Sequence, residues 1–137
     1  MKAFLDTNIF LYSFLDQDVG KKAIAAKLVA DAIRWQNGFV SLQVVKEFCN
    51  VMVKKSGRPA SEISRALNIF HCVQMVAASL ETIKRALEIR DSYSIQFYDA
   101  LMLSSAEAAA CDIIFTEDLN DGQLYGTVKA INPFKGM

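Results

Sequence analysis

The sequence predicts an α/β fold, a three-layer α/β/α sandwich around a parallel sheet of about five strands. Short apolar runs, such as residues 3–5 and 113–115, have the composition of strands that are buried on both faces. Longer segments with apolar residues at helical spacing separate these runs along the chain. Such alternation is typical of a parallel sheet covered by helices. A chain of 137 residues has the length of one domain, so we expect a single domain over 1–137.

The first half of the chain predicts two strands and three helices. Asn37-Gly38 stops the second helix, and Ser41 resembles the N-cap of the third. The elements in chain order are a strand at 3–5, a helix over 9–15, a helix over 22–36, a strand at 39–40 and a helix from Ser41 to about Lys55.

The second half repeats the pattern, with polar turns at 56–59 and 91–94 and a polar loop at 116–122. In the helix that Ser79 caps, Ile83, Ala86, Leu87 and Arg90 are expected to lie on roughly one side. The elements in chain order are a helix opening at Ser61, a strand at 72–76, a helix from Ser79 through Arg90, a helix over 95–110, a strand at 113–115 and a strand at 127–131.

Composition narrows the class of protein. Hydrophobic residues make up 53% of the chain and charged residues 22%, which fits a compact globule rather than a disordered segment. No apolar run approaches the roughly 18 residues of a membrane span. The first acid stands at position 6, so the N-terminus lacks the apolar core of a signal peptide. We therefore expect no membrane association and a cytoplasmic location. The formal net charge is zero, so a nucleic acid would have to be attracted by local basic clusters.

The cysteines and the histidine do not suggest a zinc site. Cys49, Cys72 and Cys111 lie far apart, without metal-finger or redox spacing, and we expect all three to be small core residues in a reducing compartment. His71, the single histidine, is remote from the acids discussed below, and we expect a loop or core role for it.

Two acids stand on helices at positions where apolar residues are expected. Asp99 interrupts the apolar face that Ile95, Met102 and Leu103 form, and a carboxylate on such a face is costly unless it is paired, protonated or bound to metal. Glu47 lies at the edge of the apolar stripe of its own helix. The position of Asp99 favours a functional role, whereas the spacing around Glu47 alone fits a functional residue and a surface residue equally.

Two further acids follow apolar strands. Asp6 comes directly after 3–5, and Asp118 comes shortly after 113–115. The carboxyl ends of parallel strands share one edge of the sheet, which is where ligands bind in open α/β folds. Thr116, two residues before Asp118, can donate a hydrogen bond that orients it.

Each acid also has a structural interpretation. Asp6 or Asn8 can cap the following helix, and Asp118 can serve as a loop or helix cap. Glu47 can be a surface residue. Asp99 can pair with a buried arginine such as Arg85 or Arg90. The joint pattern favours function, because strand-end and helix-face acids converge in a parallel α/β fold.

A shared cleft for these acids requires compensation of charge. Two unit charges about 4 Å apart repel by roughly 4 kcal/mol at an effective dielectric constant near 20. No lysine or histidine within these stretches neutralises the acids, since Lys46 beside Glu47 projects elsewhere on the helix. Raised pKa values or a divalent metal remain, and carboxylate-rich ligation suits Mg²⁺ or Mn²⁺. Such ions suit phosphoryl chemistry, where they generate a nucleophile from water and stabilise a leaving oxygen.

These stretches resemble those of the PIN-domain nucleases, and in particular the VapC-type toxin ribonucleases of toxin–antitoxin pairs. The resemblance covers essentially the whole chain, and the order and spacing of the motifs make it specific. The motifs are Leu5-Asp6-Thr7-Asn8, Val44-Val45-Lys46-Glu47-Phe48, Tyr98-Asp99-Ala100-Leu101 and Thr116-Glu117-Asp118-Leu119.

The resemblance implies a Mg²⁺- or Mn²⁺-dependent endoribonuclease that acts on RNA, forms a homodimer and has a cognate antitoxin protein. It implies that four acids are catalytic and bind the metal, namely Asp6, Glu47, Asp99 and Asp118. Asn8 and Thr116 would support them, and Asp121 is a possible further acid, whereas Glu117 is expected to point outward. Lys54, Lys55 and Arg58 are candidates for holding the RNA backbone, with a solvated helix end as the alternative.

Three other functions remain open at this stage. A phosphohydrolase of the haloacid-dehalogenase type requires a second Asp two residues after the first, where this chain has Asn8. A non-catalytic PIN-like protein-binding module would not need the intact acids. A PIN-type nuclease in RNA processing, outside any toxin pair, would keep the same acids, and the short chain favours the toxin.

Overall fold

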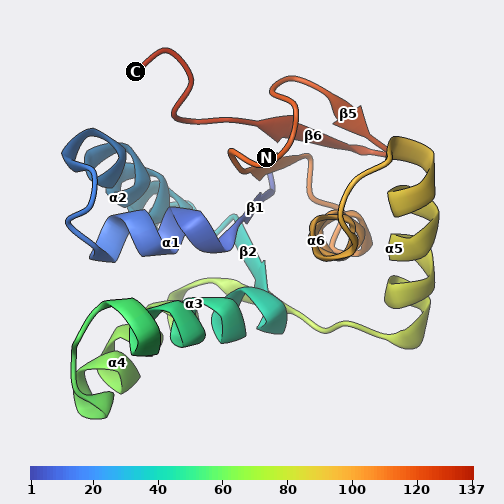
Figure 1. Cartoon of the computed structure of the whole chain (residues 1–137). Coiled ribbons are helices and arrows are strands. Elements are labelled where there is room, and N and C mark those ends of the chain that lie inside the picture. Colours follow the sequence, from blue (N-terminus) through green and yellow to red (C-terminus); the bar gives the residue numbers. More distant parts are fainter.

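A six-stranded sheet lies at the centre of the computed structural model, which describes residues 1–137 (Figure 1). Its order is β3-β2-β1-β4-β6-β5. Five strands are parallel to their neighbours, as the sequence predicts, and β5 pairs with β6 in the antiparallel direction as an additional edge strand. The strands are β1 (Ala3–Leu5), β2 (Gly38–Ser41), β3 (Gln74–Val76), β4 (Ile113–Phe115), β5 (Leu124–Tyr125) and β6 (Val128–Ile131).

Helices pack on either side of the central strands. Figure 1 shows α1 and α2 together on one side and α5 and α6 on the other, with α3 running beneath β2. None of the helices combines the length and apolar character needed to cross a membrane. The helices are α1 (Thr7–Phe14), α2 (Val19–Arg34), α3 (Leu42–Lys55), α4 (Ala60–Ala66), the 3-10 helix η1 (Leu67–Cys72), α5 (Leu80–Tyr93) and α6 (Phe97–Ala108).

Capping explains where two helix boundaries differ from those that the sequence predicts. Helix α2 begins at Val19 rather than 22, because the Asp18 carboxylate accepts a hydrogen bond from the backbone N–H of Lys21 at 3.0 Å. Helix α5 continues through most of the predicted turn at 91–94. It ends at Tyr93, because the next residue, Ser94, is left-handed with a φ of 54°.

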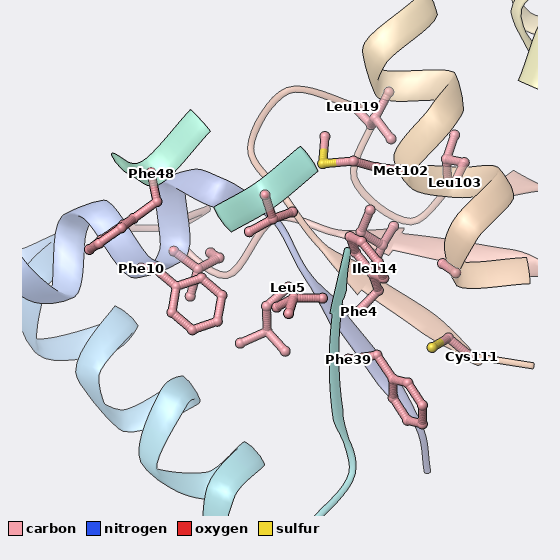
Figure 2. Packing of buried hydrophobic residues seen from close by; sticks show 14 of the residues in the cluster. Phe4, Leu5, Phe10, Phe39, Phe48, Met102, Leu103, Cys111, Ile114 and Leu119 are labelled. Carbon is pink, nitrogen blue, oxygen red and sulfur yellow. The ribbon is translucent and has the colours of Figure 1, made fainter. Parts of the chain in front are cut away.

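The core fills both faces of the sheet. Figure 2 shows Phe4, Phe39 and Ile114 on three adjacent strands, with Phe10 and Phe48 of α1 and α3 close by. Both faces of the strands are covered, so β1 and β4 are all-apolar runs rather than alternating ones. This packing fixes the strand ends from which the candidate site is built.

One expectation about burial is wrong, and α5 packs on a different face from the one that carries Ile83 and Leu87. Cys111 is buried and Cys49 is partly buried, but Cys72 is exposed at the end of η1. On α5 the buried residues are Thr82, Ala86 and Ile89, whereas Ile83 and Leu87 are 40% and 49% exposed.

The capping box at the start of α5 explains the second difference. The Ser79 and Thr82 side chains cap each other's backbone N–H groups. The Ser104 hydroxyl of α6 donates a hydrogen bond to the Thr82 carbonyl at 2.7 Å, which turns the Thr82 side of α5 toward α6. A face that includes a threonine is not recognised by a purely apolar pattern.

Candidate active site

Four acids that are far apart in the sequence line one pocket of about 320 Å³ at the carboxyl edge of the sheet. Asp6 follows β1, Glu47 lies in the middle of α3, Asp99 lies in the first turn of α6, and Asp118 lies in the loop after β4. The structure therefore brings together the four residues that the sequence singles out as catalytic.

Asp6 is the most buried of the four, with 3% of its surface exposed. It occupies the N-cap position of α1, but its side chain makes no capping hydrogen bond. Instead its Oδ2 accepts a hydrogen bond from the Thr116 hydroxyl at 2.8 Å. The pKa of Asp6 is raised to about 7, chiefly because the carboxyl group is buried; the charges of Asp118 and Asp99 also raise this pKa, and the Thr116 hydrogen bond lowers it. The capping interpretation of Asp6 is therefore wrong.

Thr116 connects two of the acids. Its hydroxyl donates to Asp6 and accepts a hydrogen bond from the backbone N–H of Asp118 at 3.1 Å. The sequence predicts that Thr116 donates to the Asp118 side chain, and the structure shows the opposite direction and a backbone partner. Residues Leu5 and Phe115 are in register on adjacent parallel strands, which places Asp6 and Thr116 side by side.

Glu47 is held by two neutral donors. Its Oε2 accepts a hydrogen bond from the Thr7 hydroxyl at 2.9 Å, and its Oε1 accepts one from Gln43 Nε2 at 2.9 Å. Gln43 Nε2 also lies 3.3 Å from the Tyr98 carbonyl oxygen, and Gln43 Oε1 is buried without a partner. Sequence analysis missed Thr7 and Gln43, although the spacing of four residues between Gln43 and Glu47 is a usable signal.

Asp99 has no cationic partner. The arginines that could have paired with it are engaged elsewhere, because Arg85 binds Glu107 and Glu88, and Arg90 binds Asp91. Asp99 is half-buried, and burial followed by the charges of Asp118 and Glu47 raises its pKa above the ordinary value. A buried Arg–Asp99 pair is therefore not the explanation for this acid.

The predicted supporting residues divide into two groups. Asn8 lines the pocket, together with Gln43, Asn50, Gln96 and Tyr98.

Asp121, the possible further acid, does not line the pocket. Its Oδ1 accepts a hydrogen bond from the Asn132 N–H at 2.8 Å, and its Oδ2 lies 3.5 Å from Lys135 Nζ. Lys54, Lys55 and Arg58 lie exposed at and beyond the end of α3, outside the pocket lining.

The donor set of the pocket fits a divalent ion. No lysine, arginine or histidine lines the pocket, so the four acids share it without a neutralising cation. No three carboxylate, thiol or imidazole side chains are grouped closely enough to cage an ion by themselves. Mg²⁺ usually keeps several waters and uses one or two carboxylates, so an open, all-oxygen pocket suits it better than a closed cage.

The fold is similar to that of solved toxin–antitoxin proteins. A toxin–antitoxin complex from Klebsiella pneumoniae matches with a TM-score of 0.74 and 19% identity, over 97% of this chain and 98% of that one. Mycobacterium tuberculosis VapC20, described as a sarcin-ricin loop cleaving toxin, matches with a TM-score of 0.69 and 16% identity, over 85% and 90%. Rickettsia felis VapBC2, bound to a DNA fragment from its promoter, matches with a TM-score of 0.69 and 16% identity, over 95% and 97%.

Sequence comparison gives the family. No curated protein matches the chain at a significant level. The family model described as PIN domain matches residues 3–122, which include all four acids of the pocket. The chain therefore belongs to the PIN domain family.

Proposed function

We propose that this protein is a Mg²⁺- or Mn²⁺-dependent endoribonuclease and the toxin component of a toxin–antitoxin pair. The observation that carries the proposal is the convergence of Asp6, Glu47, Asp99 and Asp118 on one pocket that no basic residue lines. Membership of the PIN domain family supports a nuclease. The toxin assignment draws on the names of its structural relatives, one of which is a toxin that cleaves the sarcin-ricin loop.

The acids would divide the work between ion binding and orientation. When bound, the ion supplies Lewis acidity that activates water and stabilises the leaving oxygen of an RNA phosphodiester. Asp6, Asp99 and Asp118 would share the ion with bound waters, since they are not grouped closely enough to cage it by themselves, and Thr116 fixes one oxygen of Asp6. Glu47, fixed through both oxygens by Thr7 and Gln43, would orient water and substrate.

Neutral polar groups of the pocket favour RNA as the substrate. Asn50 and Gln96 line the pocket with exposed amide groups, which can bond the ribose 2′-hydroxyl that distinguishes RNA from DNA. The exposed ring of Tyr98 lines the pocket and offers a stacking surface for an unpaired base. Asn8 adds a further polar group. Lys54, Lys55 and Arg58 would contact the RNA backbone farther along the strand.

A homodimer and an antitoxin are the protein partners that we propose, in the cytoplasm. An apolar groove of about 810 Å³ adjoins the acid pocket and shares Gln43, Glu47 and Tyr98 with it. Its remaining lining includes Leu42, Met75 and Leu101, the first two of which are exposed. Exposed apolar surface of this kind marks protein interfaces. Analytical ultracentrifugation of Leu42→Arg against wild type tests the dimer, which should dissociate in the variant.

A cleavage assay tests the nuclease. Purified wild type should cut single-stranded RNA with Mn²⁺ or Mg²⁺ and stop cutting in EDTA, whereas Asp99→Ala should fold but not cut. Asp91→Ala is the matched control, because Asp91 is an exposed acid on α5 outside the pocket, and it should retain full activity. An Asp99→Ala protein that cuts RNA at the wild-type rate would contradict the proposal and favour a non-catalytic binding module.

Expression in cells separates a toxin from an RNA-processing nuclease. A toxin should arrest growth when the wild type is expressed, and the Asp99→Ala variant should not. Co-expression of a small protein encoded beside the gene should restore growth if that protein is the antitoxin. Active nuclease without growth arrest would favour the alternative of a PIN-type enzyme in RNA processing.

A further inference from the structure

Glu117 lies between Thr116 and the pocket residue Asp118, but its own side chain bonds to groups outside the acid pocket. Its Oε2 accepts a hydrogen bond from Lys21 Nζ at 2.7 Å, and its Oε1 accepts one from the Tyr12 hydroxyl. Lys21 Nζ also donates to the Tyr12 oxygen at 3.3 Å. These three side chains, which we name the Glu117 clamp, tie the loop after β4 to both α1 and α2.

Aromatic rings support the clamp. Lys21 Nζ lies 4.8 Å from the centre of the Tyr12 ring and 5.3 Å from that of Phe134, and the two rings contact each other edge to face. The side chains of Lys21 and Glu117 are only 26% and 20% exposed. Both carboxylate oxygens of Glu117 and the ammonium group of Lys21 are thus hydrogen-bonded. By contrast, Lys22, the next residue of α2, pairs with Asp16, whose side chain is 82% exposed.

Asp118 depends on its backbone for orientation. Its carboxylate is exposed and accepts no hydrogen bond, so no partner group fixes the side chain. Its backbone is fixed from the site by the Thr116 hydroxyl at 3.1 Å and from the opposite side by the neighbouring residue Glu117. The chain bends at residues 117–119, and within this bend Asp118 lines the pocket while the Glu117 side chain contacts α1 and α2.

We infer that the Glu117 clamp positions Asp118 for binding of the divalent ion, so that Tyr12, Lys21 and Glu117 are positioning residues of the nuclease. The inference rests on the proposed function. Outer-shell partners of metal ligands commonly change metal affinity 10–100-fold when they are removed. The clamp is such a shell, although it acts through the chain rather than through a hydrogen bond to the ligand itself.

The sign of the effect distinguishes positioning from simple electrostatics. Replacing Lys21 by methionine removes a positive charge near an acidic pocket, and Coulomb's law alone then predicts tighter binding of a cation. Loss of the clamp predicts weaker binding, because Asp118 is no longer held. Lys21→Met keeps most of the aliphatic stem over the Tyr12 and Phe134 rings, so packing is largely preserved.

The experiment is a calorimetric titration of Mn²⁺ into wild type and variants. Lys21→Met should raise the Kd for Mn²⁺ roughly tenfold, Tyr12→Phe should raise it in the same direction, and Lys21→Arg should restore it. Lys22→Met is the matched control, since it removes the same charge one residue away without touching the loop, and it should leave the Kd unchanged or slightly lower. The metal-free melting temperature should change little in all of them, because partly exposed ion pairs contribute little stability.

A double variant identifies the route of the effect. With Asp118→Asn already present, Lys21→Met should produce no further loss of Mn²⁺ affinity. An undiminished loss in that background, or a Lys21→Met protein that binds Mn²⁺ as tightly as wild type or more tightly, would overturn the inference. Wild-type protein that binds no Mn²⁺ would refute the metal-dependent function itself, which is a different result from intact wild-type binding with an indifferent clamp.

Discussion

Replacing Asp6 by asparagine should stabilise the metal-free protein above neutral pH and remove most of its pH dependence below it. Asparagine resembles the protonated form of aspartic acid, and its carbonyl oxygen can still accept the hydrogen bond from the Thr116 hydroxyl. The substitution therefore removes a buried charge while it keeps the shape and the hydrogen bond of the site.

The sign follows from the raised pKa of Asp6. The unfolded chain releases this proton near the ordinary value of 3.8, and the folded protein keeps it up to about pH 7. Between these values the folded state binds more protons than the unfolded state, so the free energy of unfolding falls as the pH rises. A rise from 3.8 to about 7, at 1.36 kcal/mol per pKa unit, corresponds to about 4 kcal/mol lost between pH 4 and 8. Domains are stable by roughly 5–15 kcal/mol in total, so the loss is large.

Urea unfolding in EDTA at pH 5, 6, 7 and 8, followed by circular dichroism, measures this free energy. Wild type should lose about 2–3 kcal/mol between pH 5 and 8, and Asp6→Asn should lose much less and exceed wild type at pH 8. Parallel curves for the two proteins would refute the reasoning, because the buried carboxylate would then not carry the strain. Asp91→Asn, an exposed acid on α5, should follow wild type.

Three further predictions test the metal, the core and the thiols. Mn²⁺ at a hundred times its Kd should stabilise wild type by about 2.7 kcal/mol, seen as a higher melting temperature that EDTA reverses; an unchanged melting temperature would count against the pocket as a metal site. Phe48→Ala should lower the free energy of unfolding by about 3–5 kcal/mol in urea titrations, because Phe48 is fully buried. Trp35 is 65% exposed, so Trp35→Ala should lower the free energy of unfolding far less than Phe48→Ala. Equal losses of this free energy in the two variants would contradict the core assignment. Exposed Cys72 should react with a disulfide reagent in the native protein. Cys111 is buried and its pKa is raised to about 11, so it should react only after unfolding. Rapid reaction of both remaining thiols, Cys49 and Cys111, in the native Cys72→Ser variant would contradict this burial pattern.

The acids could be found from the sequence because they violate local patterns. Asp99 breaks an apolar helical face, and Asp6 and Asp118 terminate apolar runs, so each is visible without coordinates. Their convergence follows from parallel strand topology, which the alternation of elements also predicts. The PIN fold and its five parallel strands are confirmed, and they are the part of the molecule that periodicity encodes.

The polar contacts around the acids could not be predicted from the sequence. Thr7 reaches Glu47 only because α1 and α3 pack together, and a hydrogen bond across 40 residues leaves no periodic signal, unlike the bond from Gln43 to Glu47 within α3. Strand β5 has two residues, too few for an alternating pattern, and it exists because the glycine turn at Gly126 returns the chain onto β6. Cys72 was misjudged because burial statistics describe cysteines on average and not the exposed end of η1.

Helix α1 touches the site at two levels. Thr7 at its start donates to Glu47, and Tyr12 in its second turn donates to Glu117. An α-helix rotates by about 100° per residue, so these two contacts require an interval of five residues between them. A single residue inserted after Ile9 would leave Thr7 in place and turn Tyr12 away from the Glu117 carboxylate. Insertions within α1 are therefore expected to break one of the two contacts.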